Sequence, residues 1–417
     1  LILSMGCQSV LAANWEWGSN FGASADWNDN PALVSSERNP QSTFRILAIY
    51  SGEFVRLSPN SELRFQPRVT RDFYSKKEQK DLESTDFFLP GNYRLTLQRT
   101  SWSLGYNLSR QNVLSDETTL ETGDLNSLNA DDIVYRASLS PGLSWTLSGK
   151  DQLFMGLVAN ATDYELPDTN RADSIGGGFN GSYTRSLTRR QTLGFTASFL
   201  KYKSDNTRLI IFGDPPGLFE IETINKSSSS SLTLDYGLRT SPTSSLNFKF
   251  GLQDTEVENT TTETSSGLPF PIGNTTTPFT STTYNIVYRK TLEQGGFNIN
   301  ASRGVTPAAN GQPQDRYQLV FAGNTELTSK LNAKWVFSAS QQESIVIAAT
   351  DGVLTRKNRN YNADLRLNWS FTRKWIINAT YAYRRADRDR GLANDSFLAE
   401  SHQVLLGVTY VWKSIRR

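Results

Sequence analysis

Short segments in which apolar and polar residues alternate constrain the fold of this chain more than any other feature. Between Ser231 and Thr240, one set of alternate residues is apolar and the other is mostly polar: Leu232, Leu234, Tyr236 and Leu238 against Thr233, Asp235, Gly237 and Arg239. Side chains of a β-strand point in turn to opposite faces, so such a segment has one apolar and one polar face. The segments 364–371 and 375–384 repeat the pattern, which predicts many half-apolar strands.

The connections between these segments alternate in length along the chain. Eight are short, at Ser58-Pro59-Asn60, Arg99-Thr100, Gly149-Lys150, Thr188-Arg189, Ser241-Pro242-Thr243, Glu293-Gln294-Gly295, Ser329-Lys330 and Arg373-Lys374. Nine are long, over 29–40, 75–89, 114–130, 165–172, 204–222, 259–279, 306–314, 343–356 and 388–398. Seventeen connections predict eighteen strands, with every short turn at one end and every long loop at the other.

This asymmetry separates a membrane barrel from a soluble β-sandwich, which shares the alternation but does not require long and short connections to alternate. Outer-membrane barrels have short periplasmic turns and long extracellular loops. We therefore predict an all-β fold, a closed antiparallel transmembrane β-barrel of about 18 strands in the bacterial outer membrane, in contact with outer-membrane lipid and lipopolysaccharide. Since backbone hydrogen bonds must be met inside the membrane, the first strand, near Trp15 to Trp27, should pair with the last, Ser401 to Trp412.

The composition agrees with a barrel. Mean hydropathy is −0.46, which leaves no stretch for a membrane-spanning helix, whereas a barrel needs only half of each strand to be apolar. Tryptophans near predicted strand ends, such as Trp102, Trp145 and Trp375, fit the aromatic girdles of such proteins. The net charge of +2, without a clustered basic stripe, gives no indication of nucleic-acid binding.

The N-terminal residues resemble the end of a secretory signal. We predict a signal remnant over 1–12, with a small residue, Ala12, before the cleavage point, and an undivided barrel over 13–417. The single cysteine, Cys7, would be removed with the signal, so that the barrel has no disulfide. The alternative is lipoprotein processing at Cys7, to which Ser4-Met5-Gly6 is a poor match.

Residue types that carry out chemistry are scarce. The single histidine, His402, lies in phase with Val404 and Leu406, which predicts a lipid-facing position at the loop end of the last strand. One histidine cannot supply a histidine metal cluster, and this one points away from a catalytic site. We therefore expect no enzyme activity, no catalytic or metal-binding residue and no cofactor.

Three further motifs have structural interpretations. The acidic pairs Asp131-Asp132 and Asp387/Asp389 are read as solvated loop charge, or as groups that bridge to lipopolysaccharide through a divalent cation. Gly176-Gly177-Gly178 lacks a following helix and is no phosphate loop, so its glycines should relieve crowding or bend the wall. The polar runs around Ser227–Ser231 and Thr260–Thr262, with Thr275–Thr277, are interpreted as exposed polar backbone.

The inward faces of the predicted strands are rich in cations. The inward basic positions are Arg45, Arg64, Arg68, Arg94, Arg136, Arg239, Lys249, Arg289, Lys334, Arg366 and Arg384, and the inward acids are fewer: Glu16, Glu62, Asp72, Asp235 and Asp364. Arginine keeps its charge and is not tolerated unpaired in a dry core, so the lumen should be wet. Two interpretations stay open: the cations pair with wall acids and brace the barrel, or they form a basic lining that favours anionic or sugar-like solutes.

Short motifs carry a family resemblance. The sequence Asp26-Trp27-Asn28-Asp29-Asn30-Pro31 after the first strand, and Ser140-Pro141-Gly142 within a later one, resemble β-barrel porins found with exopolysaccharide biosynthesis and export systems. The usual tyrosine of the first motif is Trp27 here. The resemblance implies an outer-membrane barrel that works beside an export machine for surface polysaccharide.

Three functions therefore follow from the sequence. The first is a pore for anionic or sugar-like solutes, or a barrel that supports exopolysaccharide export, with polysaccharide or export machinery as partners. The second is a scaffold or adhesin whose lumen is plugged. The third is a membrane-embedded hydrolase, which the outward position of His402 argues against.

Overall fold

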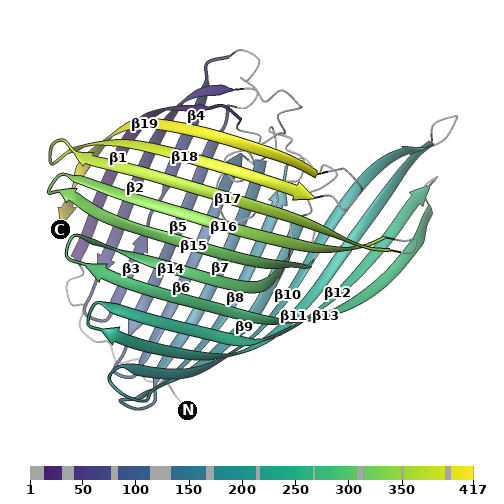
Figure 1. Ribbon diagram of the computed structural model, residues 1–417, viewed down its shortest axis with the longest axis horizontal. Helices are drawn as coiled ribbons and strands as arrows, with labels where there is room; N and C mark the ends of the chain where they lie inside the picture. Colours follow the sequence, from purple (N-terminus) through teal and green to yellow (C-terminus); the bar gives the residue numbers. More distant parts are fainter. Residues whose placement is uncertain are drawn as a thin grey trace.

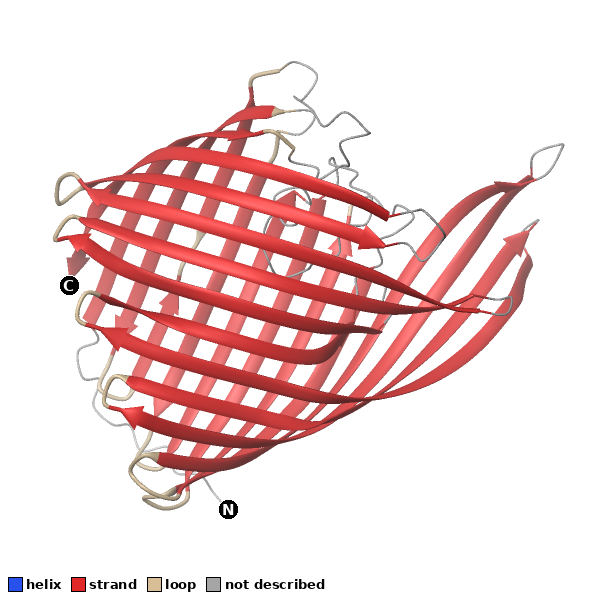
Figure 2. Ribbon diagram, viewed as in Figure 1, coloured by secondary structure: helices blue, strands red, loops and turns tan. Residues whose placement is uncertain are grey.

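The computed structural model is a closed barrel of antiparallel strands (Figures 1 and 2). It describes residues 14–30, 42–76, 83–112, 133–165, 173–212, 217–265, 268–307, 313–348, 352–389 and 396–416. These residues contain no helix, and hence none long and apolar enough to cross a membrane. The predicted signal remnant with Cys7, and Asp131-Asp132, lie outside the described residues.

The chain forms nineteen strand segments. The first ten are β1 (Asn14–Asn28), β2 (Thr43–Leu57), β3 (Ser61–Phe65), β4 (Arg68–Tyr74), β5 (Thr85–Thr96), β6 (Thr100–Asn112), β7 (Ile133–Thr146), β8 (Asp151–Tyr164), β9 (Asp173–Ser186) and β10 (Gln191–Phe212). The others are β11 (Gly217–Ser241), β12 (Ser244–Ser265), β13 (Leu268–Leu292), β14 (Gly295–Pro307), β15 (Pro313–Thr328), β16 (Leu331–Ala348), β17 (Gly352–Ser370), β18 (Trp375–Asp389) and β19 (Ser396–Arg416).

Two of these segments are halves of one barrel strand. Both β3 and β4 lie between β2 and β5, so the barrel has the eighteen strands that the connections predict. The interruption falls at Pro67, which has no N–H to donate to a neighbouring strand. The carbonyl of Pro67 still accepts a hydrogen bond of 2.8 Å from the Gly52 N–H, so the wall stays connected there.

Each strand pairs with the next, and β1 pairs with β19, which confirms the predicted closure between the first and last strands. The register runs from Glu16 opposite Arg416 to Asn28 opposite Gln403, with one irregularity between Trp17 and Ser19. All eight short turns lie at one end of the barrel, here called the turn end, and the opposite end is the loop end. Closure leaves no open sheet edge within the barrel, as a membrane requires.

The outer face carries a belt of large apolar side chains. Phe21, Phe195 and Leu406 are more than half exposed, at 58%, 51% and 58%. Paired residues share a face, so apolar side chains line up across strands, as in the stacked rings of Trp17, Phe54 and Phe65 at 5.6 and 4.5 Å. The predicted lipid-facing residues lie on this face: Leu246, Phe248, Phe250, Leu331, Ala333, Trp335, Phe337, Val404, Leu406 and Val408.

Three of the predicted long loops are wrong, because strands run through most of them. The ranges 204–222, 259–279 and 343–356 lie largely within paired strands, and β10 to β13 are 22 to 25 residues long. The serine run and the threonine-rich segments are therefore strand residues, with Thr260 opposite Asn274 for example. The polar side chains of these segments predict loops, but a strand whose two faces both meet water needs no apolar alternation.

The long strands form a sheet that projects beyond the rest of the barrel at the loop end (Figure 1). Within the described pairings, β13 contacts β14 only from Tyr284 to Leu292, and β10 contacts β9 only up to Asp205. Where β13 leaves β14, the Gln253 side chain of β12 provides hydrogen bonds to the backbone of β14. Its amide nitrogen donates to the Val305 carbonyl at 3.0 Å, and its amide oxygen accepts from the Val305 N–H at 3.3 Å. Prolines at 269, 271 and 278 of β13 remove N–H groups near the projecting edge, which disfavours the addition of another strand.

Candidate functional site: the inner wall

The register places the eleven cations of interest on one face of the barrel wall. Because directly paired residues lie on the same face, Arg45 shares a face with Asp26, and this face is opposite to that of the exposed Phe21 and Trp27. The same reasoning strand by strand gives the inner face to Arg45, Arg64, Arg68, Arg94, Arg136, Arg239, Lys249, Arg289, Lys334, Arg366 and Arg384. Their surroundings define one group at the seam and a second on the far wall, with Arg64 and Arg68 between them.

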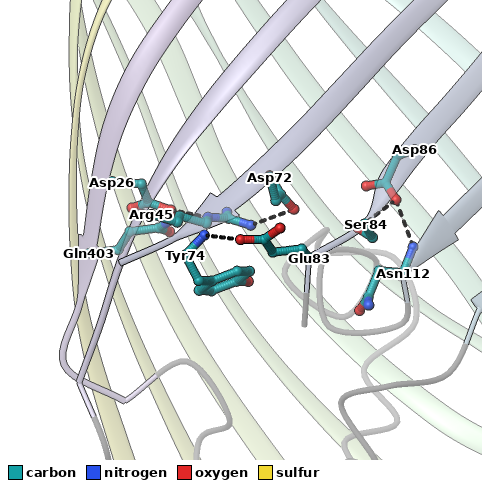
Figure 3. Close-up of polar contacts among 9 residues, drawn as sticks. All are labelled: Asp26, Arg45, Asp72, Tyr74, Glu83, Ser84, Asp86, Asn112 and Gln403. Carbon is teal, nitrogen blue, oxygen red and sulfur yellow. Dashed lines mark hydrogen bonds and ion pairs between the residues drawn. The ribbon is translucent and has the colours of Figure 1, made fainter. Parts of the chain in front are cut away.

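The first group lies at the seam where the chain closes, and its charges are paired and buried. Arg45 Nε donates to Asp26 Oδ2 at 2.7 Å, and Arg45 Nη1 donates to Asp72 Oδ2 at 3.3 Å (Figure 3). Gln403 Nε2 donates to both Asp26 oxygens at 2.9 Å. Asp26 and Asp72 are 2% and 4% exposed, so the network joins β1, β2, β4 and β19 away from water.

The motif Asn28-Asp29-Asn30 lies at the loop end of β1, two residues beyond Asp26, and its hydrogen bonds join β1 to β19. Asn28 Oδ1 accepts from the Asn30 N–H at 2.9 Å and from Ser401 Oγ at 2.8 Å. Asp29 Oδ1 accepts from the His402 N–H at 2.7 Å. These polar groups satisfy the backbone where the first strand ends, so the role of the motif visible here is closure of the barrel.

Buried and half-buried charged residues extend along both sides of the seam. Arg384 on β18 is half-buried and interacts electrostatically with Asp364, Asp26 and Arg45. Asp364 in turn interacts with both Arg384 and Arg366, and Lys334 is opposite Arg366. On the other side, Asp86 Oδ1 accepts from the Asn112 N–H at 2.8 Å and from Ser84 Oγ at 3.3 Å (Figure 3). Here the bracing interpretation accounts for the charges.

Cations between the seam and the far side are half-exposed. Arg64 contacts Glu53 and Glu62 at 3.4 and 3.2 Å, and its side chain is 42% exposed. Arg68 lies over the Phe88 ring, with 3.9 Å from its guanidinium carbon to the ring centroid. The aromatic face covers one side of the guanidinium, and Arg68 as a whole remains exposed.

The second group lies on the far wall, formed by β11 to β15. Lys249 is 52% exposed, and its ammonium is 3.6 Å from Asp235, which also accepts from Thr196 Oγ1 at 2.6 Å. A recess of about 290 Å³ opens beside it. Its polar lining residues are Thr233, Lys249, Thr283, Tyr284, Asn285, Ser302, Arg303, Arg316 and Gln318, and Thr283 Oγ1 is buried without a hydrogen-bond partner.

Sequence reasoning missed Arg316. Its neighbours Gln314 and Gln318 give the phase that assigns it to the inner face, opposite Gly304 and Gln342. The predicted loop 306–314 ends two residues before Arg316, so this residue lies in the expected strand, which begins at Pro313, but was not assigned to the inner face. The apolar residues Tyr317, Leu319 and Phe321, which alternate with Arg316 and Gln318, were the available signal.

His402 lies on the outer face, as its phase predicts. It is opposite Tyr383, its ring is 5.1 Å from that of Tyr383, and its Nδ1 is 2.9 Å from Tyr381 Oη. Histidine, cysteine, aspartate and glutamate residues form no group of three that could hold a metal ion within the described part of the chain.

Comparison with known proteins supports the fold. No protein-family model matches the sequence, and no curated protein does. Among solved structures, the ferric-catecholate import receptor Fiu from E. coli K12 in its open form is 9% identical with a TM-score of 0.50, over 94% of this chain and 81% of that one. The ferric citrate transporter FecA in the unliganded form is 8% identical with a TM-score of 0.50, over 94% and 78%. Pseudomonas aeruginosa OpdQ is 8% identical with a TM-score of 0.45, over 96% and 98%.

At these identities the likeness concerns the fold alone. A closed barrel with an apolar outer belt and polar inner wall is the architecture by which proteins span the bacterial outer membrane. The chain is an outer-membrane β-barrel.

Proposed function

We propose that the protein is an outer-membrane pore for anionic or sugar-like solutes. The observation that carries this proposal is the recess of the far wall, where Lys249 and Arg316 stand beside Asn285, Ser302 and Gln318. Fixed cations attract carboxylate or phosphate groups, and a low-dielectric wall concentrates their field in the lumen. Amides and hydroxyls supply the donors and acceptors that sugar hydroxyls need. Such a pore needs no catalytic step, metal or cofactor.

The resemblance of the Trp27-Asn28-Asp29-Asn30 region to porins of exopolysaccharide systems suggests a more specific role. In this version of the proposal, the pore works beside an export machine, and its solute is a polysaccharide chain or a fragment of one. The acidic sugars common in such polymers fit a lining in which cations outnumber acids. Deletion of genes for polysaccharide synthesis or export should then change the phenotype of a strain that lacks this protein.

A scaffold or adhesin role is the second candidate. The projecting sheet of β10 to β13 favours it, because this sheet extends beyond the remaining strands at the loop end, where a partner outside the membrane could be contacted. A scaffold does not require conductance, and this difference separates the two candidates.

Recordings in planar bilayers test the proposed pore. The unmodified protein should give stable conductance steps, and its reversal potential in a salt gradient should indicate anion preference that weakens as ionic strength rises. Joint replacement of Lys249 and Arg316 by glutamine should shift the reversal potential towards cations. Lys290→Gln is the matched control, since Lys290 is on the outer face, opposite Phe297. The absence of conductance steps would favour the scaffold, and a cation-selective unmodified pore would contradict the proposal.

A further inference from the structure

Three lysines gather on the outer face of the barrel near the loop end. Lys201 and Lys203 lie on β10 in phase with the lipid-facing Phe195 and Phe199, and Lys226 on β11 is directly opposite Lys203. Like charges in directly opposite positions destabilise a sheet. Lys203 and Lys226 therefore repel each other across the strand pair. Asp205 and Glu258 supply counter-charges, and both lysine side chains remain exposed to a group outside the protein.

Along β10, the lysines lie where the apolar belt of the outer face ends, which is the expected position of the membrane–water boundary. On β10 the outward residues Phe195 and Phe199 are 51% and 42% exposed, and the next outward residues are the two lysines. Lys201 Nζ is 5.7 Å from the centre of the Phe199 ring. A lysine stem along an apolar surface with its ammonium at the end is the arrangement of residues at the membrane–water boundary.

The lysines border a second recess, of about 640 Å³. Lys201, Lys203 and Lys226 line it together with Glu256, Glu258 and the glycine segment 176–177. The recess lies along the part of β10 to β12 next to the projecting sheet. Its charged lining residues, Lys201, Lys203, Lys226, Glu256 and Glu258, are in the outer-face phase, and Tyr202 and Ser227 border it from the opposite phase. Exposed Phe179 and Leu157 lie on the same face below it.

Gly177 and Gly178 of the glycine segment 176–178 have different roles. A Cβ on Gly178 would collide with the Phe199 carbonyl, so this glycine relieves crowding between β9 and β10. A Cβ on Gly177 would meet only the Val158 carbonyl, at an acceptable 3.4 Å. Gly177 is therefore not required by local packing, and its missing side chain leaves the floor of the recess open.

The recess combines cations with carboxylates. Lys226 is 3.9 Å from Glu258 and Lys203 is 2.8 Å from Asp205, while both lysine side chains stay about half exposed, at 55% and 45%. Phosphate groups suit the lysines, and the carboxylates suit divalent cations that themselves bind phosphate. Apolar surface below this polar edge suits acyl chains.

We infer that this recess binds the phosphorylated headgroup of lipopolysaccharide. The loop end faces the external leaflet, which in a bacterial outer membrane consists of lipopolysaccharide, a phosphorylated sugar headgroup on several acyl chains. Its phosphates lie against Lys201, Lys203 and Lys226, and its acyl chains run along Phe199 and Phe179. The inference depends on the membrane orientation of the barrel and not on passage of a solute.

Binding of purified lipopolysaccharide to the full chain in detergent tests the inference. Joint replacement of Lys201, Lys203 and Lys226 by glutamine should weaken binding at least about tenfold, since each basic residue near an anionic membrane surface contributes separately. Chemically dephosphorylated lipopolysaccharide should bind the unmodified protein as weakly. The matched control replaces Lys150, Lys290 and Lys374, which lie at or beside turns at the other end, by glutamine and should bind as the unmodified protein does.

A second variant separates the recess from general surface charge. Gly177→Leu fills the floor without removing a charge and should also weaken binding, while a gel assay that distinguishes folded from heat-unfolded barrels checks that both variants are folded. Unchanged binding by the triple lysine variant would overturn the inference. So would full binding by Gly177→Leu, or equal affinity of the unmodified protein for phosphatidylglycerol, because either result would indicate attraction to any anionic lipid surface.

Discussion

The seam and the far wall of the barrel both carry basic and acidic side chains on the inner face. These side chains differ in burial and in their charged partners. At the seam, Arg45 is only 16% exposed and lies between two buried aspartates. On the far wall, Lys249 is 52% exposed and borders a recess. An inward cation is therefore not by itself a solute site: burial and the supply of protein partners decide whether it braces the wall or remains accessible.

The largest expected effect comes from breaking the buried seam. Arg45→Met leaves Asp26 and Asp72 without their cation in a buried site, which should cost about 3–5 kcal/mol of folding free energy. Lys249→Met, on the exposed wall, should cost less than about 1 kcal/mol. Denaturant unfolding of the barrel in detergent or lipid measures both values. Equal costs would remove the distinction between the two walls.

The comparison also depends on the assignment of faces, which a pair of neighbouring residues tests. Leu367 is on the outer face, opposite Ala333 and Ala379, whereas Asn368 is on the inner face, opposite Asn332 and Asn378. Leu367→Arg places a charge in lipid and should cost about 2–4 kcal/mol, whereas Asn368→Arg should cost little. The free energy of unfolding in lipid vesicles gives the answer. Similar costs at both positions would contradict the assignment of faces, and a larger cost at Asn368 would mean that the two faces are exchanged.

Sequence reasoning reached the strand number, the turns and the faces because these depend on local alternation. It could not find the seam network, since Asp26 meets Gln403 only when the first and last strands pair, and nothing in the local sequence encodes that register. It also ended β10 to β13 too early. Beyond the membrane edge both faces of a strand meet water, so the alternation that identifies strands is lost there although the backbone pairing continues.

The Asn28-Asp29-Asn30 motif illustrates a related limit. The sequence indicates a resemblance to polysaccharide-associated porins at this position, but the contacts of these residues run to Ser401 and His402 across the seam. A motif can thus mark a family through the way its barrel closes, and need not lie where a solute binds. The evidence for a solute must come from the exposed far wall.

The smallest expected effect sharpens the comparison within the lumen itself. If the far-wall recess binds anionic sugars, then an oligosaccharide of acidic sugars added to the pore should reduce its ion current, and Lys249→Gln should weaken this block several-fold through loss of one charge-assisted contact. Arg64 contacts two carboxylates, Glu53 and Glu62, at 3.4 and 3.2 Å, whereas Lys249 contacts one, Asp235, at 3.6 Å, so Arg64→Gln should shift ion selectivity but weaken the block less. Titration of the block for both variants compares them directly. If Arg64→Gln has the larger effect on the block, the solute binds nearer to β3 than to β12. The exposure of a cation would then not identify the one that binds the solute.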